Sequence, residues 1–272
     1  MYSIRCSSEN HGALTNADRI TRLEELAYNA WTARYVEQYG QWFLRADEGV
    51  TRRANSVFPF GAPSTSNLQD AVEHCIGFYK KRDILPRFQV TSASKPDGLD
   101  KSLENLGFAF EMRTYLQTAP IEKLLHFEPT IKVEILKDPV PVWIRTYAKA
   151  GGFGRHSMKI REGIFRRTAL DKAFALAKTE EDGMGAGLGI LEGDWLGLFG
   201  IETLPSQRRK GVATAVNHAL ASWGAQRGAR RVYLQVEASN DSALKLYSKM
   251  GFETEYHYWY RTLGLDTAAD SP

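Results

Sequence analysis

Apolar residues recur along the chain with two periods, one typical of helices and one typical of strands. From Asn16 to Trp31 the apolar side chains return every three or four residues, and Thr15 or Asn16 stands at the N-cap position. From Arg231 to Glu237 they alternate with polar ones, as in a half-buried strand. The pattern therefore predicts a mixed α/β protein.

The predicted elements occur in the same order in both halves of the chain. The first half predicts, after its first helix, strands at 33–39, 41–46 and 51–60, helix 68–82, strand 88–91, helix 99–106 and strand 108–117. The second half predicts strand 131–136, helices 139–150 and 158–170, strands 173–178, 186–192 and 196–204, helix 209–227, strand 231–237, helix 241–250 and strand 256–261. Both halves contain three strands, a helix, a strand, a helix and a strand, which favours two copies of one α/β unit.

The stretch Thr118–Thr130, which contains Pro120 and Pro129, has the composition of a linker. We therefore predict a first domain at 1–120, a linker at 121–130 and a second domain at 131–265. No strong residue-level repeat supports a duplication.

Composition narrows the class of protein. The chain has 272 residues, 35 Lys and Arg against 32 Asp and Glu, and a net charge of +3, which is too small for the electrostatic footprint of a nucleic-acid binder. Its two cysteines, Cys6 and Cys75, make no disulfide framework or metal site, which favours a reducing, cytoplasmic location. We expect no signal peptide and no membrane-spanning helix.

The segment Leu204–Val216 carries a candidate anion site. A strand ends there, a turn containing Arg208, Arg209 and Lys210 follows, and an amphipathic helix begins. Amides at a helix start have no partner inside the helix and lie at the positive end of its dipole. Gly211 lets the backbone approach a phosphate closely, and the small Ala213 does not obstruct it. A solvated basic turn is the alternative interpretation.

A second segment, Val232–Phe252, has the spacing Asn240-x-x-Ala243-x-x-Leu246-Tyr247-x-x-x-Gly251-Phe252. Together with Arg208-x-x-Gly211-x-Ala213, it resembles the GNAT superfamily of acyl-CoA-dependent N-acetyltransferases. The resemblance covers roughly residues 131–262. The fold that it implies is two tandem GNAT-like domains, each a twisted mixed sheet flanked by helices.

The resemblance also implies a cofactor and its site. Acetyl-CoA would be the acyl donor, with Ile201, Glu202 and Thr203 along its thioester on a strand that splays from its neighbour. Its pyrophosphate would meet the amides of Arg209, Lys210, Gly211, Val212, Ala213 and Thr214, which Arg208 precedes. Asn240 would touch the pantetheine, and Tyr247 would protonate the departing CoA thiolate. A buried tyrosine with no chemical role is the alternative for Tyr247.

The general base is left open. Ribosomal-protein alanine acetyltransferases, which are similar in motif, place a glutamate five residues before the asparagine, where this chain has Gln235. Glu202 is the nearest carboxylate on the splayed strand, and Glu237 lies beyond Gln235. Side chains alternate along a strand, so Glu202 reaches the acceptor only if a bulge re-aims it. A water chain, or an amine that arrives partly deprotonated, is the alternative.

The first half lacks the cofactor motifs. No basic glycine-containing loop follows its third strand, and its nearest echo of the second motif is Leu103–Phe108, with the sequence LENLGF. We interpret it as a degenerate GNAT-like domain, as in tandem enzymes such as mycothiol synthase. Its role is either structural or, as the alternative, to form one wall of the acceptor cleft.

The remaining motifs do not favour another class of enzyme. Gly183–Gly189 has leucine where a dinucleotide fingerprint needs its third glycine, so we predict a hairpin turn and a small-residue strand there. The histidines form no metal-ligand pair, and no P-loop or hydrolase serine motif occurs, so we expect no metal. The aromatic run Tyr256–Tyr260 predicts a strand with alternate rings in the core.

The sequence thus predicts transfer of an acetyl group from acetyl-CoA to an amine, expected to be a small molecule, by direct attack in a ternary complex. Two alternatives stay open: a non-catalytic acyl-CoA sensor that uses the same loop, and a nucleic-acid binder. We expect no nucleic-acid or membrane partner. The oligomeric state stays open, and a monomer is compatible with tandem halves that pack on each other.

Overall fold

This computed structural model describes residues 15–179 and 182–265, and the chain forms two compact units. Of the described residues, unit 1 comprises 15–114, 163–168 and 257–265, and unit 2 comprises 115–162, 169–179 and 182–256. Strands β5 (Ala109–Pro120) and β11 (Glu253–Thr262) and helix α6 (Arg155–Arg167) have residues in both units. Cys6 and the N-terminal segment considered for a signal peptide lie outside the described residues.

These units differ in their bounds from the predicted domains at 1–120 and 131–265 and the predicted linker at 121–130. The chain passes from one unit to the other at Thr114–Tyr115, and the described segments 163–168 and 257–265 return to unit 1. The start of the predicted linker forms helix α4 (Ile121–Leu125), whose Ile121 and Leu124 are buried in the core of unit 2. Packing of these apolar side chains outweighs the turn tendency of the neighbouring prolines.

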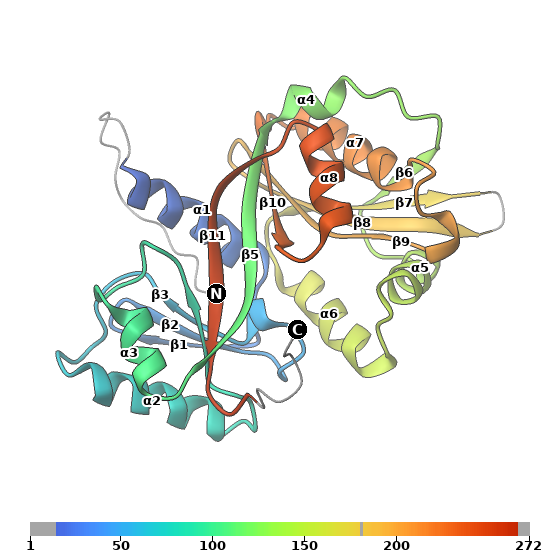
Figure 1. The fold of residues 1–272 in the computed structure, drawn as a ribbon. Helices are drawn as coiled ribbons and strands as arrows, with labels where there is room; N and C mark the ends of the chain where they lie inside the picture. Colours follow the sequence, from blue (N-terminus) through green and yellow to red (C-terminus); the bar gives the residue numbers. More distant parts are fainter. Residues whose placement is uncertain (1–14, 180–181, 266–272) are drawn as a thin grey trace. The chain divides into compact units, whose positions relative to one another are not determined.

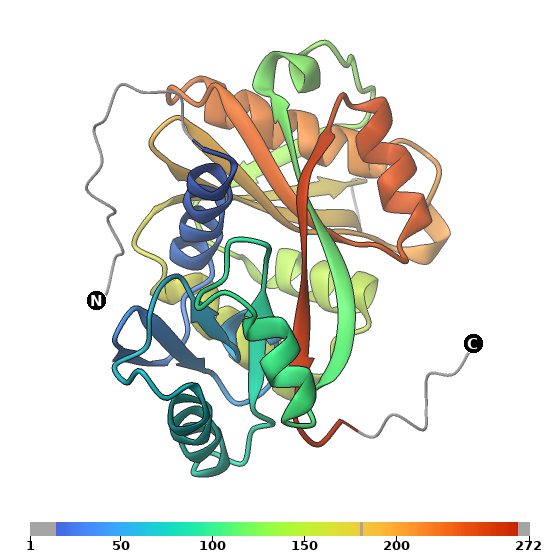
Figure 2. The ribbon, with the colours of Figure 1, turned by 60° about the vertical axis from the view of Figure 1, so that its left-hand side comes forward.

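Unit 1 is a mixed sheet with helices on both faces. Its strands lie in the order β1 (Tyr35–Tyr39), β2 (Trp42–Ala46), β3 (Val57–Pro59), β4 (Arg87–Val90) and the end of β11, with β3 and β4 parallel and the other pairs antiparallel. Its helices are α1 (Asn16–Ala30), α2 (Leu68–Lys80) and α3 (Leu99–Asn105). Figure 2 shows α1 and α2 on opposite sides of the first strands. The predicted N-cap is confirmed, since the Thr15 side chain accepts from Asp18 N.

Strand β2 divides its side chains between the two faces of this sheet. Trp42, Leu44 and Ala46 pack with α2 and α3, whereas Phe43 packs with Tyr28 of α1. Arg45, on the same face as Phe43, is buried with its guanidinium carbon 3.8 Å from the centre of the Phe58 ring. Burial lowers the pKa of Arg45, and the aromatic face partly compensates its lost hydration.

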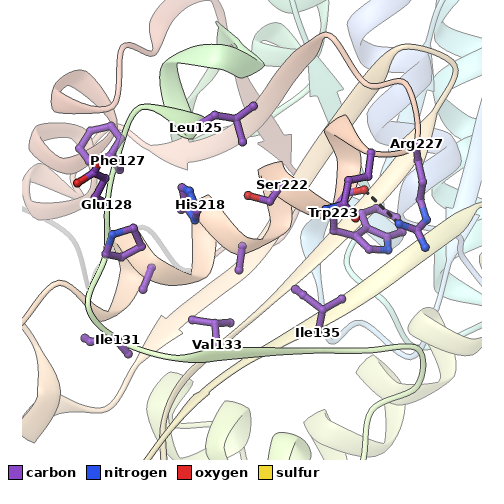
Figure 3. A pocket seen from close by; sticks show the side chains of 14 residues that line it. Leu125, Phe127, Glu128, Ile131, Val133, Ile135, His218, Ser222, Trp223 and Arg227 are labelled. Atoms are coloured by element: carbon purple, nitrogen blue, oxygen red, sulfur yellow. Dashed lines mark hydrogen bonds between the residues drawn. The ribbon is translucent and has the colours of Figure 1, made fainter.

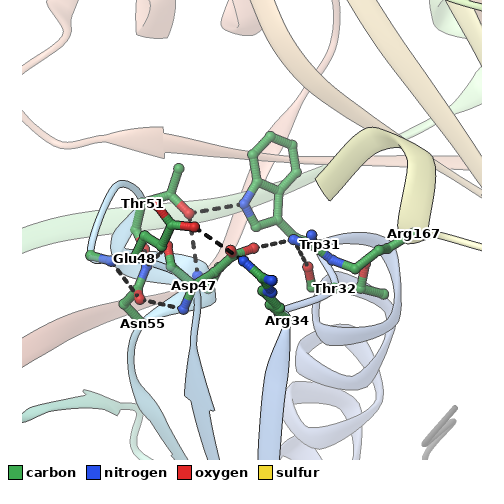
Figure 4. A network of polar contacts seen from close by, with 10 residues as sticks. Trp31, Thr32, Arg34, Asp47, Glu48, Thr51, Asn55 and Arg167 are labelled. Carbon is green, nitrogen blue, oxygen red and sulfur yellow. Dashed lines mark hydrogen bonds and ion pairs between the residues drawn. The ribbon is translucent and has the colours of Figure 1, made fainter. Parts of the chain in front are cut away.

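A polar network closes the end of unit 1 near the turn after β2 (Figure 4). The Trp31 indole donates to Thr51 Oγ1 at 3.1 Å, and Asn55 Oδ1 accepts from Asp47 N and from Gly49 N at 3.0 Å. Arg167, from the end of α6, pairs with Asp47. The network satisfies backbone groups that the turn would otherwise bury unpaired.

Unit 2 is built on a sheet with the strand order β5, β10 (Arg231–Glu237), β9 (Trp195–Thr203), β8 (Gly183–Glu192), β7 (Asp171–Lys178) and β6 (Val133–Leu136). β9 and β10 are parallel, and the pairs from β6 to β9 are antiparallel. The helices α5 (Pro141–Gly151) and α7 (Val212–Ala225) lie on opposite sides of this sheet, and α8 (Asp241–Lys249) follows β10 (Figure 1). The expected mixed α/β architecture with flanking helices is confirmed in each unit.

Several local predictions are confirmed as well. Residues 183–189 lie in β8, the predicted small-residue strand, and Tyr256, Tyr258 and Tyr260 are buried alternately along β11. The predicted strand 51–60 is instead a 3-10 turn (Arg52–Ala54) followed by the short β3, because Thr51 caps the turn by accepting from Ala54 N. No helix among the described residues is long and apolar enough to cross a membrane.

Candidate active site

Strands β9 and β10 separate where the predicted site begins. Their parallel pairing runs from Trp195 opposite Arg231 to Leu198 opposite Leu234, although β9 continues to Thr203 and β10 to Glu237. The last residues of the two strands therefore leave backbone groups on β9 that β10 does not take up. Ile201, Glu202 and Thr203 all lie on the stretch of β9 that does not pair with β10, although Glu202 and Thr203 pair with β8 on the other side.

A bulge in β9 decides which way these residues point. Leu196 and Leu198 pack in the core with α7, and unbroken alternation would put Gly200 and Glu202 on the same face. Between the pairs Leu188–Phe199 and Ala186–Glu202, however, β9 has one extra residue, and Gly200 has φ +53°. Ile201 consequently takes the α7 face, and Glu202 points to the opposite face, where α5 packs.

The turn before α7 leaves its amides open. Gly211 is the N-cap residue in the left-handed region, with φ +86°, and no side chain caps the helix. Arg209 also has a positive φ, +59°, so the turn alternates conformations in the way that makes a concave row of amides. The first backbone bond from this end is Ala215 N to Gly211 O at 3.0 Å. The amides at 209–214 thus form the candidate anion site.

Glycines of β8 bring α7 close to the sheet. A Cβ at Gly187 would lie 2.7 Å from both Ile201 Cδ1 and Val216 Cγ1, and a Cβ at Gly185 would lie 2.6 Å from Val212 Cγ1. Only glycine permits these distances. The small-residue strand therefore fixes the start of α7 directly beside the unpaired end of β9.

Asn240 and Tyr247 occupy the start and the buried side of α8. Asn240 Oδ1 accepts from Ala243 N at 3.1 Å, so this oxygen caps the helix. Tyr247 is 8% exposed, and its ring packs edge-on against Phe252 with centroids 5.5 Å apart. In the part of the chain that the structure describes, its hydroxyl makes no hydrogen bond. The ring packs in the core, and the hydroxyl is available to donate a hydrogen bond.

Glu202 is close enough to Tyr247 to affect the titration of the phenol. Burial raises the pKa of Tyr247, and the negative field of Glu202 raises it further. Burial also raises the pKa of Glu202, while Arg161 and Arg208 act in the opposite direction. The phenol consequently stays protonated at neutral pH, and the carboxylate binds a proton more readily than a solvated one. The pair has the electrostatics of an acid and a base.

The two other positions considered for the general base lie on β10. Gln235 is half-buried on β10, and Glu237 is exposed at its end. Two features of the site were missed from sequence: the packing of Tyr147 against Gly200, and Arg161 beside Glu202. Glycine inside the strand pattern LGLFGIET is a recognised signal of a bulge, whereas no local pattern signals the position of Arg161.

A separate groove of about 740 Å³ lies between α7 and the segment Leu125–Ile135, as Figure 3 shows. His218, Ser222 and Trp223 of α7 line it, and none of the predicted site residues does. Among the described residues, no group of His, Cys, Asp or Glu side chains is arranged to hold a metal ion.

Comparisons with known proteins identify the family of this chain. The family described as "Probable histone acetyltransferase Rv0428c C-terminal" matches residues 17–261. A relative from Bacillus subtilis, "Uncharacterized N-acetyltransferase YobR", is 32% identical over 89% of this chain and 98% of its own length. A relative from Mycobacterium tuberculosis, "Probable histone acetyltransferase Rv0428c", is 26% identical over 91% of this chain and 76% of its own length.

Solved structures share the fold. A GCN5-related N-acetyltransferase from Kribbella flavida superposes with TM-score 0.68 and 17% identity, over 93% of this chain and 97% of its own. A tandem GNAT protein from the clavulanic acid biosynthesis pathway superposes with TM-score 0.55 and 11% identity, over 72% and 70% of the two chains. The chain therefore belongs to the Rv0428c C-terminal family and is a GNAT-type N-acetyltransferase.

Proposed function

We propose that unit 2 transfers the acetyl group of acetyl-CoA to a primary amine, by direct attack while both substrates are bound. The observation that carries the proposal is the convergence of three features: the unpaired end of β9, the uncapped start of α7, and Tyr247 of α8 within the field of Glu202. A thioester is already activated, so its aminolysis needs mainly positioning and proton transfers.

Each residue has a stated role in this proposal. The amides at 209–214, with Arg208, Arg209 and Lys210 around them, hold the pyrophosphate of CoA. Ile201, Glu202 and Thr203 run along the pantetheine and thioester. A backbone N–H of this stretch stabilises the charge that develops on the thioester oxygen. Asn240 keeps its amide nitrogen for the pantetheine, because its oxygen caps α8.

The reaction balances in two proton transfers. The amine nitrogen attacks the carbonyl carbon, the carbon–sulfur bond breaks, and its electron pair leaves with sulfur. Glu202 accepts a proton from the attacking nitrogen, and Tyr247 donates its phenolic proton to the thiolate. Burial raises the pKa of both groups, which strengthens the Glu202 carboxylate as a base and keeps the Tyr247 phenol protonated until the thiolate departs.

Steady-state kinetics test the proposal. With acetyl-CoA and a panel of amines, release of the CoA thiol should require an acceptor, and initial velocities should give intersecting rather than parallel double-reciprocal lines. Mass spectrometry should find the acetyl group on the acceptor nitrogen. Tight CoA binding with no turnover by any amine would instead identify a sensor, and a stable acetyl-enzyme would rule out direct attack.

A further inference from the structure

Arg161 of α6 is a cation held in one position within unit 2. Its guanidinium carbon lies 3.9 Å from the centre of the Phe153 ring, and its Nε donates to Ser157 Oγ at 3.2 Å. Within the described residues, its two terminal nitrogens make no hydrogen bond and no ion pair. A guanidinium that is fixed on one side and unpaired at its end is prepared for an external anion.

A continuous row of rings connects Arg161 to the bulge in β9. Tyr147 lies against Gly200, where a Cβ would stand 2.7 Å from the tyrosine hydroxyl. The Tyr147 and Phe153 rings have centroids 5.1 Å apart, and Arg161 covers Phe153. Gly151 makes room for this stack, because a Cβ there would lie 2.2 Å from Phe153 Cε2. The guanidinium is thereby tied to the segment of β9 that carries Glu202.

The charges that act on Glu202 are positive, whereas a basic acceptor would need negative charges around it. Arg161 and Arg208 are the cations whose fields act on Glu202. A lysine-rich segment would place further positive charge beside these groups and would be repelled.

We propose that Arg161 binds an anionic group of the acceptor, a carboxylate or a phosphate, while Glu202 receives the acceptor's amine. This inference rests on the proposed function and narrows its substrate class. The acceptor is then a small zwitterion, such as an amino acid or an aminoalkyl phosphate, and not a basic polypeptide. The name of the mycobacterial relative points to a histone acceptor for that protein. In this chain, the positive charges of Arg161 and Arg208 disfavour such a basic acceptor.

Matched acceptor pairs test the inference. Release of CoA thiol from acetyl-CoA is measured with L-amino acids against their amides, and with aminoalkyl phosphates against the corresponding amino alcohols. Binding of each compound to the protein saturated with CoA is measured in parallel by calorimetry. The anionic member of at least one pair should bind and react better, and the pair that shows the preference distinguishes carboxylate from phosphate.

Variants of α6 assign the preference to one residue. Arg161→Met should raise KM for the anionic acceptor about 10- to 100-fold, the range expected for loss of a charge-assisted contact, with little change in kcat. Its KM for the neutral partner should hardly change. Arg161→Lys should recover part of the loss. Lys159→Met removes the same charge from an exposed position on the same helix, and should leave the ratio of the two acceptors unchanged.

Each outcome decides the inference. Equal use of both members of every pair, a preference for neutral amines or lysine-rich peptides, or equal effects of Arg161→Met and Lys159→Met would overturn it while leaving acetyl transfer intact. If no amine is acetylated but anionic ligands still bind in an Arg161-dependent way, the proposed function fails and the anion site stands. If no anionic ligand binds or reacts, the anion site is wrong.

Discussion

The two units each carry a junction from a strand into a long helix, and the two junctions treat their backbone amides differently. Before α2, Asn67 Oδ1 accepts from Gln69 N at 3.0 Å, and Gln41 Oε1 accepts from Ala62 N at 3.1 Å. Before α7, Gly211 offers no side-chain cap, and the space where its Cβ would stand is open. Unit 1 satisfies such amides with side chains of its own, whereas unit 2 has no side-chain cap at this helix start, as the proposed anion site requires.

A second pair of segments, Leu103–Phe108 and Tyr247–Phe252, shares a backbone motif and differs at its first residue. In both units a helix ends in a glycine with positive φ followed by phenylalanine, whose N–H bonds back five residues: Phe108 N to Leu103 O, and Phe252 N to Tyr247 O, each 3.0 Å. The position that holds a tyrosine in unit 2 therefore holds a leucine, fully buried, in unit 1. Unit 1 keeps the helix-ending motif and lacks the hydroxyl.

Tyr247→Phe should have the largest effect on activity. It removes the hydroxyl that unit 1 also lacks at the matching position. The ring keeps its contact with Phe252, and only the phenolic oxygen is lost. We expect kcat to fall about 10²- to 10⁴-fold, the usual cost of losing a general acid, with CoA affinity nearly unchanged. Full activity in the variant would remove Tyr247 from the mechanism and leave departure of the thiolate to water.

Gly211→Glu should close the open junction. A carboxylate in the amide row repels the pyrophosphate, and we expect CoA affinity to fall about 100-fold or more, as for loss of two charge-assisted contacts. Gly211→Ala is the matched control, because it imposes the same strain at φ +86° without the charge. Calorimetry measures both affinities, and circular dichroism checks the fold. Equal losses in the two variants would mean that strain, and not anion binding, explains the effect.

The pH profile sharpens the role of Glu202. Burial raises its pKa above the ordinary value, and the base is active only when deprotonated. We therefore expect kcat/KM to rise about tenfold per pH unit below that raised pKa and then to level. Glu202→Gln should remove this limb. A wild-type limb that persists in the variant would assign it to the acceptor amine.

Glu202 should also make the free energy of unfolding depend on pH, in the direction opposite to that of kcat/KM. Because the folded pKa of Glu202 exceeds the unfolded one, the native state binds more protons between them, and the free energy of unfolding falls as pH rises through that window. Glu202→Gln should abolish this fall. Chemical denaturation across the window measures it, and an unchanged slope in the variant would show that Glu202 is not the group responsible.

Asn67→Ala gives the smallest effect on function. Loss of the cap at α2 should lower the free energy of unfolding by about 1 kcal/mol, because Gln69 N loses its acceptor. CoA affinity should stay the same, since the proposed cofactor site lies in unit 2. A change in CoA affinity comparable to that of Gly211→Glu would contradict the contrast between the junctions.

Much of unit 2 was predictable from local patterns. The strand Arg231–Glu237 has the predicted bounds, and the glycine-rich stretch 183–189 is a strand. The bulge at Gly200 was foreseen only as a condition for Glu202 to reach the acceptor. Its position follows from the packing of Tyr147 on Gly200, which joins segments far apart in sequence. Periodicity carries no information on such contacts.

The structure adds a local reason for Asn240 that the motif did not supply. The resemblance implies a contact with the cofactor, whereas the structure shows the side-chain oxygen capping α8. Asparagine before a helix is a common cap, so the sequence alone contained this signal. The bounds of the units were less accessible, because α6 and β11 each begin in unit 2 and end in unit 1. Local composition does not mark such a change.

We propose that only the junction before α7 binds CoA, and not the junction before α2. Titration of the whole protein with CoA in a calorimeter measures the number of sites directly. We expect one site per chain, abolished by Gly211→Glu and retained in Asn67→Ala. Two sites of similar affinity, or a single site that survives Gly211→Glu with unchanged affinity, would contradict it.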